Sequence, residues 1–348
     1  MDRLFFASDY QEGAHPSIMK RLMDTNFDRS PGYGTDEITA SAKGKIRAAC
    51  ACPDAAVYFL VGGTQTNATV IDSVLHSYQG VVAADTGHIS THEAGAIEAG
   101  GHKVLTLPHH FGKIDAEQIE GLCSTFWGDG NHEHMVMPGM VYLSQPTEYG
   151  TLYSLAELTA ISRVCRKYDM KLYVDGARLA YALACPENDV ALEDLARLCD
   201  VFYIGGTKCA ALFGEAVVIP DPKLIPHFFT IIKQHGALFA KGRILGIQFD
   251  ELFTDDLYMK VGQSAVEEAA IIKEALIKAG YQLAFDTPTN QIFITLEDAE
   301  LERLSKTIEF SFWEKADDTH TVVRVATSWA TRREDTQQLL QIMCSQGA

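Results

Sequence analysis

Lys208 is the residue of this 348-residue chain whose setting most clearly suggests chemistry. It lies in the segment FYIGGTKCAALFGE (202–215) and is the only charged residue between Asp200 and Glu215. An isolated ammonium among apolar side chains is costly unless it is paired or used, and desolvation favours its neutral form. We therefore expect Lys208 to act as an amine nucleophile, of the kind that condenses with a carbonyl group.

Asp175 is expected to lie close to Lys208. It ends the apolar strand of KLYVDGARL (171–179), and the interval up to Lys208 holds a helix, with Asn188 or Asp189 as its N-cap, and the strand VFYIGG. This interval has the size of a βαβ unit, so the two residues should emerge at the same edge of a sheet. The ordinary alternative is a buried ion pair between the two side chains.

A lysine and a carboxylate at one sheet edge suit a site for pyridoxal 5'-phosphate (PLP). The lysine forms a Schiff base with the cofactor, and the aspartate keeps the ring nitrogen protonated so that the ring can accept electrons. A phosphate cradle is expected in LVGGTQTNATV (60–70), where Gly62 and Gly63 follow a strand and Thr64 and Gln65 start a helix whose free N–H groups attract anions. No nucleotide P-loop and no dinucleotide-binding motif accompanies this turn.

Two more residues are placed where they could contact a ligand. His88 follows the strand in VVAADTGHISTHEAG (81–95), and its flat imidazole could stack on a cofactor ring, although a lone histidine is more often structural. Arg324 stands alone in the apolar segment TVVRVATSW (321–329). Its guanidinium could bind a substrate carboxylate through two hydrogen bonds, the alternative being a solvated arginine on an edge strand.

The elements that must position these residues can be read from the alternation of apolar runs. Through the first two thirds of the chain, short strand-like runs alternate with amphipathic segments such as SLAELTAISRVCRKY (154–168) and DVALEDLARL (189–198). This pattern predicts an α/β fold with a mostly parallel central sheet covered on both faces. Catalytic groups are then expected beyond the carboxyl ends of the strands.

After about residue 250 the pattern changes. Helix-like SAVEEAAIIKEALIKAG (264–280) precedes three strand-like runs, NQIFITLE, TIEFSFWEK (307–315) and TVVRVATSW, and a terminal helix from about Glu334. Helices beside a few strands predict a small α+β domain. We therefore assign residues 1–248 to an N-terminal arm and a large PLP-binding α/β domain, and residues 249–348 to a small C-terminal α+β domain.

The composition limits the classes of partner. Lys and Arg number 29 against 46 Asp and Glu, a net charge of −17, and no basic run occurs, so nucleic acid and anionic membranes are poor partners. No signal-peptide pattern and no membrane-length apolar run is visible, which predicts a cytoplasmic protein. The eight cysteines lack the spacing of a disulfide scaffold or a zinc site, so we expect reduced thiols and no metal.

Together these segments resemble the PLP-dependent threonine aldolase and β-eliminating lyase family, which has the aspartate-aminotransferase-like fold type I. The resemblance runs nearly end to end. Its most specific element is YVDGARL (173–179), and GGTK (205–208) follows at the expected distance with the Schiff-base lysine. The other similar segments are FASDY (6–10), GYGTD (32–36), GGTQTN (62–67), DTGHISTHEAGA (85–96) and VVRVATSW (322–329).

The resemblance implies roles for individual residues. Lys208 would bind the cofactor covalently, Asp175 would pair with its ring nitrogen, and Arg178 would support its hydroxyl group or the substrate carboxylate. The remaining implied contacts are those of Gly63, Thr64 and Thr207 with the phosphate, of His88 with the face of the ring, and of Ser8 and Arg324 with the substrate carboxylate.

The resemblance also implies an oligomer. Arg243, in AKGRILG (240–246), is similar to the family arginine that reaches the phosphate of a neighbouring subunit. Together with Tyr33, it implies active sites shared between subunits, and hence a homodimer or homotetramer.

One departure from the family concerns the base. Where the family has Asn-Thr-His, this chain has SQPTEYGTLYSL (144–155), with Glu148 at the histidine position. The implied reaction is retro-aldol cleavage of a β-hydroxy-α-amino acid, such as threonine or allo-threonine, to glycine and an aldehyde, with Glu148 as general base. The alternatives are a PLP lyase that eliminates a β-substituent, a non-catalytic PLP-binding protein, and an α/β protein without PLP.

Overall fold

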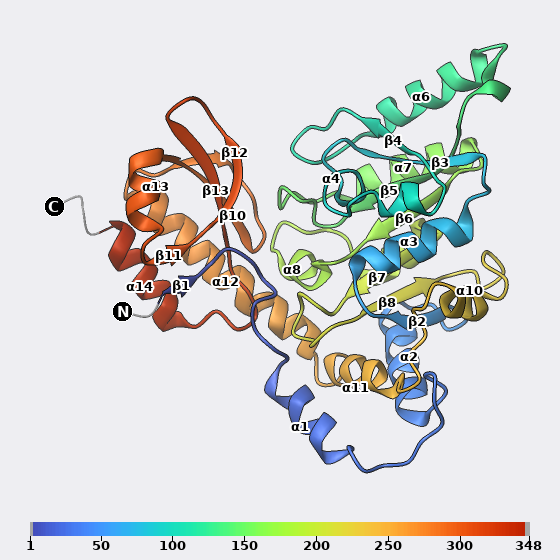
Figure 1. Cartoon of the computed structure of the whole chain (residues 1–348), viewed down its shortest axis with the longest axis horizontal. Coiled ribbons are helices and arrows are strands. Elements are labelled where there is room, and N and C mark those ends of the chain that lie inside the picture. The colour runs from blue at the N-terminus through green and yellow to red at the C-terminus, as the bar shows by residue number, and fades with distance from the viewer. Residues whose placement is uncertain (1–2, 345–348) are drawn as a thin grey trace.

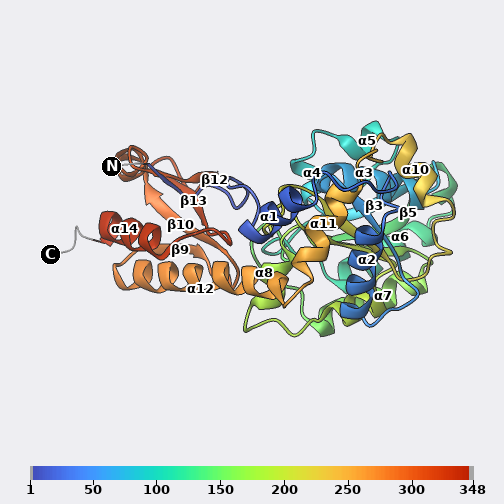
Figure 2. The same cartoon turned by 90° about the horizontal axis from the view of Figure 1, so that it is seen from below.

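The computed structural model describes residues 3–344. Figure 1 shows two parts, a larger one built on a broad sheet and a smaller one that contains both described ends of the chain. The long helix α12 (Leu257–Lys278) runs between them, as the view from below in Figure 2 also shows. The predicted division at residues 248/249 is not tested by this arrangement and stays a prediction.

The larger part is built on a seven-stranded sheet with the order β2-β8-β7-β6-β5-β3-β4. Every neighbouring pair from β7 to β4 is parallel, and only β8 runs antiparallel to its neighbours β2 and β7. The prediction of a mostly parallel central sheet is therefore confirmed. The strands are β2 (Ala56–Leu60), β3 (Gln79–Ala84), β4 (Val104–Leu107), β5 (Met137–Ser144), β6 (Lys171–Asp175), β7 (Val201–Gly205) and β8 (Glu215–Ile219).

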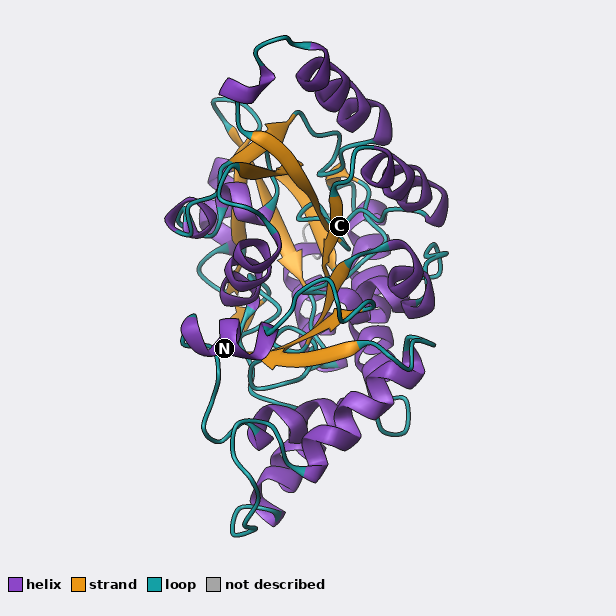
Figure 3. Ribbon diagram, turned by 90° about the vertical axis from the view of Figure 1, so that its right-hand side faces the viewer, coloured by secondary structure: helices purple, strands orange, loops and turns teal. Residues whose placement is uncertain are grey.

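Apolar cores cover both faces of this sheet, with helices outside them (Figure 3). On β3, Val81 and Ala83 belong to one core, whereas Val82 and Ala84 belong to the other, because successive side chains of a strand point to opposite faces. Burial on both faces explains why the strands read as continuous apolar runs. The surrounding helices are α1 (Pro16–Asp24), α2 (Glu37–Ala49), α3 (Gly63–Val74), α4 (His88–Thr91), α5 (Ala96–Ala99), α6 (Ala116–Gly128), η1 (His132–His134), α7 (Leu155–Lys167), α8 (Leu179–Ala184), α9 (Leu192–Leu198), α10 (Phe228–Gln234) and α11 (Arg243–Leu252).

The link between β6 and β7 differs from the prediction in its helices. The strands are parallel neighbours, so Asp175 and the segment leading to Lys208 do leave the same sheet edge. Two helices, α8 and α9, separate them instead of one, and Ala191 takes the N-cap position of α9. Neither predicted cap is available, because Asp189 accepts a hydrogen bond from the Leu155 N–H and Asn188 bonds to its own turn at Val190.

The smaller part has a four-stranded antiparallel sheet with the order β12-β13-β10-β9. The segment 307–315, predicted as one strand, is divided at Phe310: β11 pairs in parallel with the N-terminal β1, and β12 pairs with β13. After β1, the N-terminal segment crosses from the smaller part to α1 beside the larger part (Figure 1). The elements are β1 (Leu4–Phe5), β9 (Gln282–Phe285), β10 (Gln291–Glu297), β11 (Ile308–Glu309), β12 (Ser311–Lys315), β13 (His320–Ala326), α13 (Asp298–Leu304) and α14 (Arg333–Cys344).

None of the helices among residues 3–344 combines the length and the apolar character needed to cross a membrane.

Gly262 allows α12 to pack closely against α8, which leads to a prediction about stability. A Cβ atom at this position would lie 2.2 Å from the carbonyl oxygen of Ala180. We expect Gly262→Ala to lower the free energy of unfolding by about 1–3 kcal/mol, the usual cost of overpacking, as measured by urea denaturation.

Gly121, in the middle of α6, provides the matched control, because a Cβ there would meet nothing within 4 Å. Gly121→Ala should raise the free energy of unfolding by roughly 0.5–1 kcal/mol, since alanine is the better helix former. The close-packing argument fails if both variants unfold at the same urea concentration.

Candidate active site

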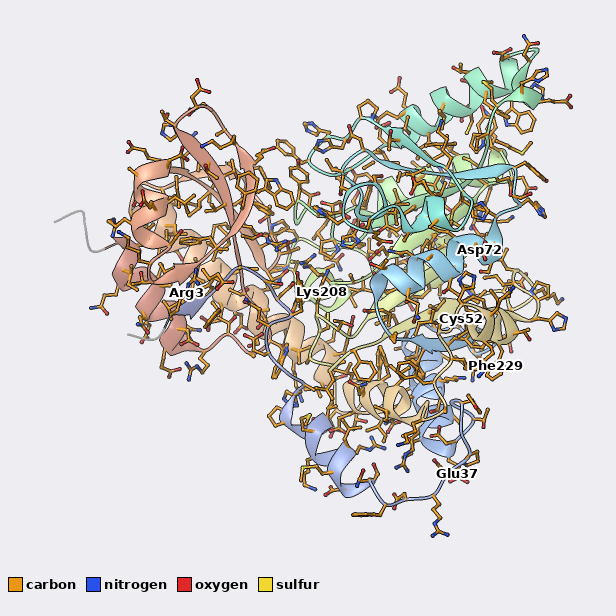
Figure 4. The ribbon with its side chains drawn as sticks, viewed as in Figure 1. Arg3, Glu37, Cys52, Asp72, Lys208 and Phe229 are labelled. Carbon is orange, nitrogen blue, oxygen red and sulfur yellow. The ribbon has the colours of Figure 1, made fainter. Side chains whose placement is uncertain are left out.

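A cleft of about 680 Å³ lies where the carboxyl ends of the central strands face β12 and β13 of the smaller sheet. Figure 4 places Lys208 between the two parts of the molecule. The cleft brings together five of the predicted site residues: His88, Glu148, Arg178, Lys208 and Arg324.

The carboxylate of Asp175 is buried beneath this cleft and surrounded by donors. One oxygen accepts hydrogen bonds from the Tyr203 hydroxyl and the Ala177 N–H, and the other from the Tyr142 hydroxyl at 2.7 Å and the Asn67 amide at 3.0 Å. Burial alone would raise the pKa of Asp175, but the charge of His88 and the side-chain hydrogen bonds outweigh it and leave this pKa lowered. Asp175 is therefore a stable anion.

Lys208 is half-buried, and its ammonium faces the ring of Tyr10 at 5.9 Å from the centroid. Burial, together with the positive charge of Arg178, lowers the pKa of Lys208. Within the described chain Lys208 forms no ion pair with Asp175 or with any other carboxylate. Its amine is thus both accessible from the cleft and biased toward the neutral, nucleophilic form.

The glycine turn between β2 and α3 lies beside Asp175. A Cβ on Gly63 would be 3.2 Å from the Tyr203 hydroxyl, which itself binds Asp175, while a Cβ on Gly62 would meet nothing within 4 Å. Gly62 is the N-cap of α3 and offers no side chain to its free N–H groups. This turn therefore has open space and available donors for an anion.

The other residues predicted to contact the cofactor near this turn have mixed surroundings. Thr64 is exposed on the first turn of α3. The side-chain oxygen of Gln65 accepts a hydrogen bond from the Val61 N–H at 3.3 Å, so Gln65 folds back onto the end of β2. Thr207 accepts one from the Gly214 N–H at 3.0 Å, which fixes the loop that carries Lys208.

Arg324 and Ser8 both present polar atoms that have no protein partner. The guanidinium of Arg324 donates to Gln291 at 2.9 Å and to the Ala7 carbonyl at 3.0 Å, but its buried Nε has no partner among residues 3–344, and neither does the buried hydroxyl of Ser8. Burial and the neighbouring charge of Arg178 lower the pKa of Arg324 to about 10. Unpaired buried donors are costly, so these two suit a ligand carboxylate.

Arg178 is engaged by a residue that the sequence analysis did not single out. Its guanidinium donates to both carboxylate oxygens of Asp9, at 2.6 and 2.9 Å, and Asp9 also accepts from Asn290 at 2.9 Å. Burial opposes the charge of Asp9, but Arg178 outweighs burial and lowers the pKa of Asp9. Asp9 thus joins the N-terminal arm to the wall of the cleft.

Glu148 and His88 contact each other through the backbone of His88. One Glu148 oxygen accepts hydrogen bonds from the His88 N–H at 2.9 Å and from the Ser144 hydroxyl at 2.7 Å. Burial raises the pKa of Glu148, and the hydrogen bonds only partly offset this effect. The imidazole of His88 bonds on its other side to Glu93, at 2.7 Å from Nδ1.

Several residues around the cleft escaped the sequence analysis. Asn67 is four positions after Gly63 in α3, a helical spacing that could have pointed to it. Glu93 lies in the bend between α4 and α5, where no periodic pattern links it to His88. The tyrosines read as apolar strand residues because only the folded sheet brings their hydroxyls to Asp175. The overlooked residues are Asp9, Asn67, Glu93, Tyr142, Tyr203 and Asn290.

Tyr33 and Arg243 lie away from the cleft within one chain. The Tyr33 N–H bonds to the carbonyl of Ala240, near the start of α11, where Arg243 donates to the carbonyls of Thr25 and Asp28. Neither residue lines the cleft around Lys208. Both lie where the segment between α1 and α2 contacts the start of α11.

The residues of the cleft fit PLP. An open anion-binding turn, a buried anion and a nucleophilic amine occur at the carboxyl edge of the central sheet, and Arg324 of β13 and Ser8 of the N-terminal arm add unpaired buried donors. The geometry thus provides each contact that the cofactor and an amino-acid carboxylate require.

Comparison with known proteins agrees with this reading. The sequence model of the family described as Beta-eliminating lyase matches residues 6–300. The chain is 30% identical to a low specificity L-threonine aldolase of Pseudomonas aeruginosa, over 86% of each chain. Its structure matches that of the Leishmania major threonine aldolase with a TM-score of 0.95 and 41% identity, over 98% of each chain. The aspartate aminotransferase of Thermus thermophilus, 13% identical with a TM-score of 0.73 over 99% of this chain and 91% of that one, shares the fold.

Proposed function

The chain belongs to the β-eliminating lyase family as a PLP-dependent lyase, and we propose that it cleaves a β-hydroxy-α-amino acid of the threonine or allo-threonine type to glycine and an aldehyde. The observation that carries this proposal is the cleft itself, which is lined by Lys208, Arg324 and a base candidate, Glu148. The threonine aldolases among its relatives support the same substrate class.

PLP would be held by groups at the carboxyl ends of four strands of the central sheet, β2, β3, β6 and β7. Lys208 would hold its aldehyde carbon, Asp175 its ring nitrogen, and the turn at Gly63 with Thr64 its phosphate, while His88 would cover the ring. PLP supplies a carbonyl group that condenses with amines and a ring that accepts the electron pair released at Cα. The lowered pKa of Asp175 is suited to this task, because a carboxylate stabilises a protonated ring nitrogen.

The substrate carboxylate would be held by Arg324 and Ser8, whose unpaired Nε and hydroxyl are the donors available for it. Fixing this group orients the bonds around Cα relative to the rest of the cleft. Glu148 would then remove the proton of the β-hydroxyl group. Because its pKa is raised by burial, Glu148 can act as a base nearer to neutral pH than an ordinary glutamate.

The competing reaction is elimination of a β-substituent. It remains a candidate because Glu148 occupies the position of the family histidine. The two reactions release different products. We expect L-threonine, L-allo-threonine or phenylserine to give glycine and the corresponding aldehyde. The aldehyde is measured by a coupled enzymatic reduction, and glycine by amino-acid analysis. Release of pyruvate and ammonia from serine or cysteine, without glycine, would instead identify a β-eliminating lyase. No turnover of any amino acid would point to a binding protein.

Replacing the base should separate chemistry from binding. We expect Glu148→Gln to lower kcat by about 100-fold or more, since general bases contribute 10²–10⁴-fold. Activity of the unchanged enzyme should rise as the pH increases through the raised pKa of Glu148, because the carboxylate is the active form. The variant should lose this rise and keep its PLP content.

Arg324→Gln is the comparison for this experiment. It should mainly raise KM, because Arg324 holds the substrate carboxylate before and during the reaction. An unchanged kcat in Glu148→Gln would reject Glu148 as the base.

We also propose a homodimer or homotetramer with shared active sites, in the cytoplasm. Arg243 and Tyr33 lie outside the cleft of their own chain, so they would serve the cleft of a second copy. The eight cysteines are free thiols, as is usual where the compartment keeps thiols reduced. Cell fractionation tests the location.

Mixing two inactive variants tests the shared site. We expect Lys208→Ala and Arg243→Ala to be inactive alone, and the co-expressed pair to regain part of the activity, because some sites then carry both native residues. Light scattering should give a mass of at least two chains. A fully active Arg243→Ala variant, or a mixture that stays inactive, would contradict the proposal.

A further inference from the structure

Glu93 is a buried carboxylate that the mechanism above does not use. Its side chain is 0% exposed, and it precedes α5 on the loop behind His88. One oxygen accepts hydrogen bonds from Nδ1 of His88 and from the Asn67 amide, each at 2.7 Å. Its other oxygen is buried with no partner among residues 3–344. Burying such a group costs stability, which its role in positioning another side chain can explain.

The orientation of Glu93 is fixed through Asn67. The amide nitrogen of Asn67 donates to Glu93 and, at 3.0 Å, to Asp175, while its carbonyl oxygen accepts a hydrogen bond from the Tyr173 hydroxyl at 2.7 Å. Both amide hydrogens are thereby used, and the amide cannot turn over without breaking all three contacts. Glu93 is consequently held in a defined place relative to Asp175.

A carboxylate beside Nδ1 decides where His88 carries its proton. An ionised carboxylate only accepts hydrogen bonds, so Nδ1 must be the donor in both the neutral and the charged ring. The imidazole lines the cleft with 32% of its side chain exposed, and Nε2 has no partner within the described chain. Any proton that enters or leaves the ring from the cleft must therefore do so at Nε2.

The other charged groups near the ring do not provide this control. Glu148 contacts the backbone N–H of His88 and not its imidazole. His92 lies beside it with ring centroids 5.7 Å apart, and Lys208 and Arg324 line the same cleft without a hydrogen bond to the imidazole among the described residues.

We propose that Glu93 is a positioning residue: it orients the imidazole of His88 and keeps a proton on Nδ1, so that Nε2 is the nitrogen that exchanges a proton with a ligand in the cleft. The use of that proton in turnover rests on the proposed aldolase function. The placement of the proton does not, and it can be measured without any turnover.

The first measurement uses the protein without cofactor or substrate. Ring nitrogens of ¹⁵N-histidine-labelled protein are recorded by NMR at a pH where the ring is neutral, and the signals of His88 are assigned by their loss in His88→Asn. We expect the Nδ1–H form to exceed the Nε2–H form about tenfold or more, the ratio that a hydrogen bond to a charged acceptor supports. A predominant Nε2–H form would overturn the proposal.

The second measurement compares variants of the PLP-loaded enzyme. Glu93→Gln should lower the Nδ1–H population and reduce kcat by about tenfold to a hundredfold, with KM within about threefold, as expected when a side chain that contacts the cofactor ring loses its support. Glu93→Asp should recover part of kcat. Glu98→Gln, on the exposed face of α5, is the matched control and should change neither quantity.

The outcomes separate this proposal from the proposed function. An unchanged kcat in a folded Glu93→Gln variant would reject the role of Glu93 in turnover. If the unchanged enzyme cleaves no β-hydroxy amino acid, the proposed function fails, and the NMR measurement alone still decides whether Glu93 fixes the proton of His88.

Discussion

The burial of one charge, the carboxylate of Asp175, sets the requirements for much of the surrounding structure. An ionised carboxylate inside a protein is tolerated only when hydrogen-bond donors replace its lost water. Here the donors come from α3, β5 and β7 and from the turn after β6 itself. Three of them are side chains that would otherwise be buried polar groups in need of acceptors, so the anion and its donors stabilise one another.

These contacts continue into a closed circuit around the floor of the cleft. From Asp175 they pass through Asn67 and Glu93 to the ring of His88, and from the backbone of His88 through Glu148 to Ser144, whose hydroxyl lies 3.3 Å from that of Tyr142. Tyr142 binds Asp175 and completes the circuit. A shift of one member would disturb hydrogen bonds on both sides of it, so the circuit constrains the floor of the cleft, where the described residues form no metal-ligand cluster and no disulfide.

The sequence was informative where chemistry depends on residue type and strand order. Lys208 and Asp175 could be paired because parallel neighbouring strands end at the same edge, and the alternating pattern predicted the sheet that delivers them. The buried tyrosines could not be found this way, since a hydroxyl at the rim of an apolar strand leaves no mark on hydrophobic periodicity. Asp9 was hidden for another reason: its partner Arg178 is 169 positions away, and no local pattern links the two.

The helix caps show a similar limit. Asn188 and Asp189 are residue types that favour an N-cap. Each can bond to several backbone groups, however, and the folded surroundings decide which of these groups becomes its partner. In the same way, the run of strand formers is divided at Phe310 because β11 before it pairs with β1 and β12 after it pairs with β13 in another sheet.

The N-terminal arm has a consequence for the timing of assembly during synthesis. Every residue proposed to hold PLP within one chain lies between 63 and 208, and the seven strands of their sheet are complete by Ile219. Ala7 and Asp9, in contrast, leave the ribosome almost first but bond to Arg324 and Asn290 only when the strands of the smaller sheet have been made. A nascent chain therefore completes the sheet that carries the residues proposed to hold PLP well before it can form the proposed carboxylate site around Arg324. The site that we propose for catalysis is thus complete only when nearly the whole protein has been made.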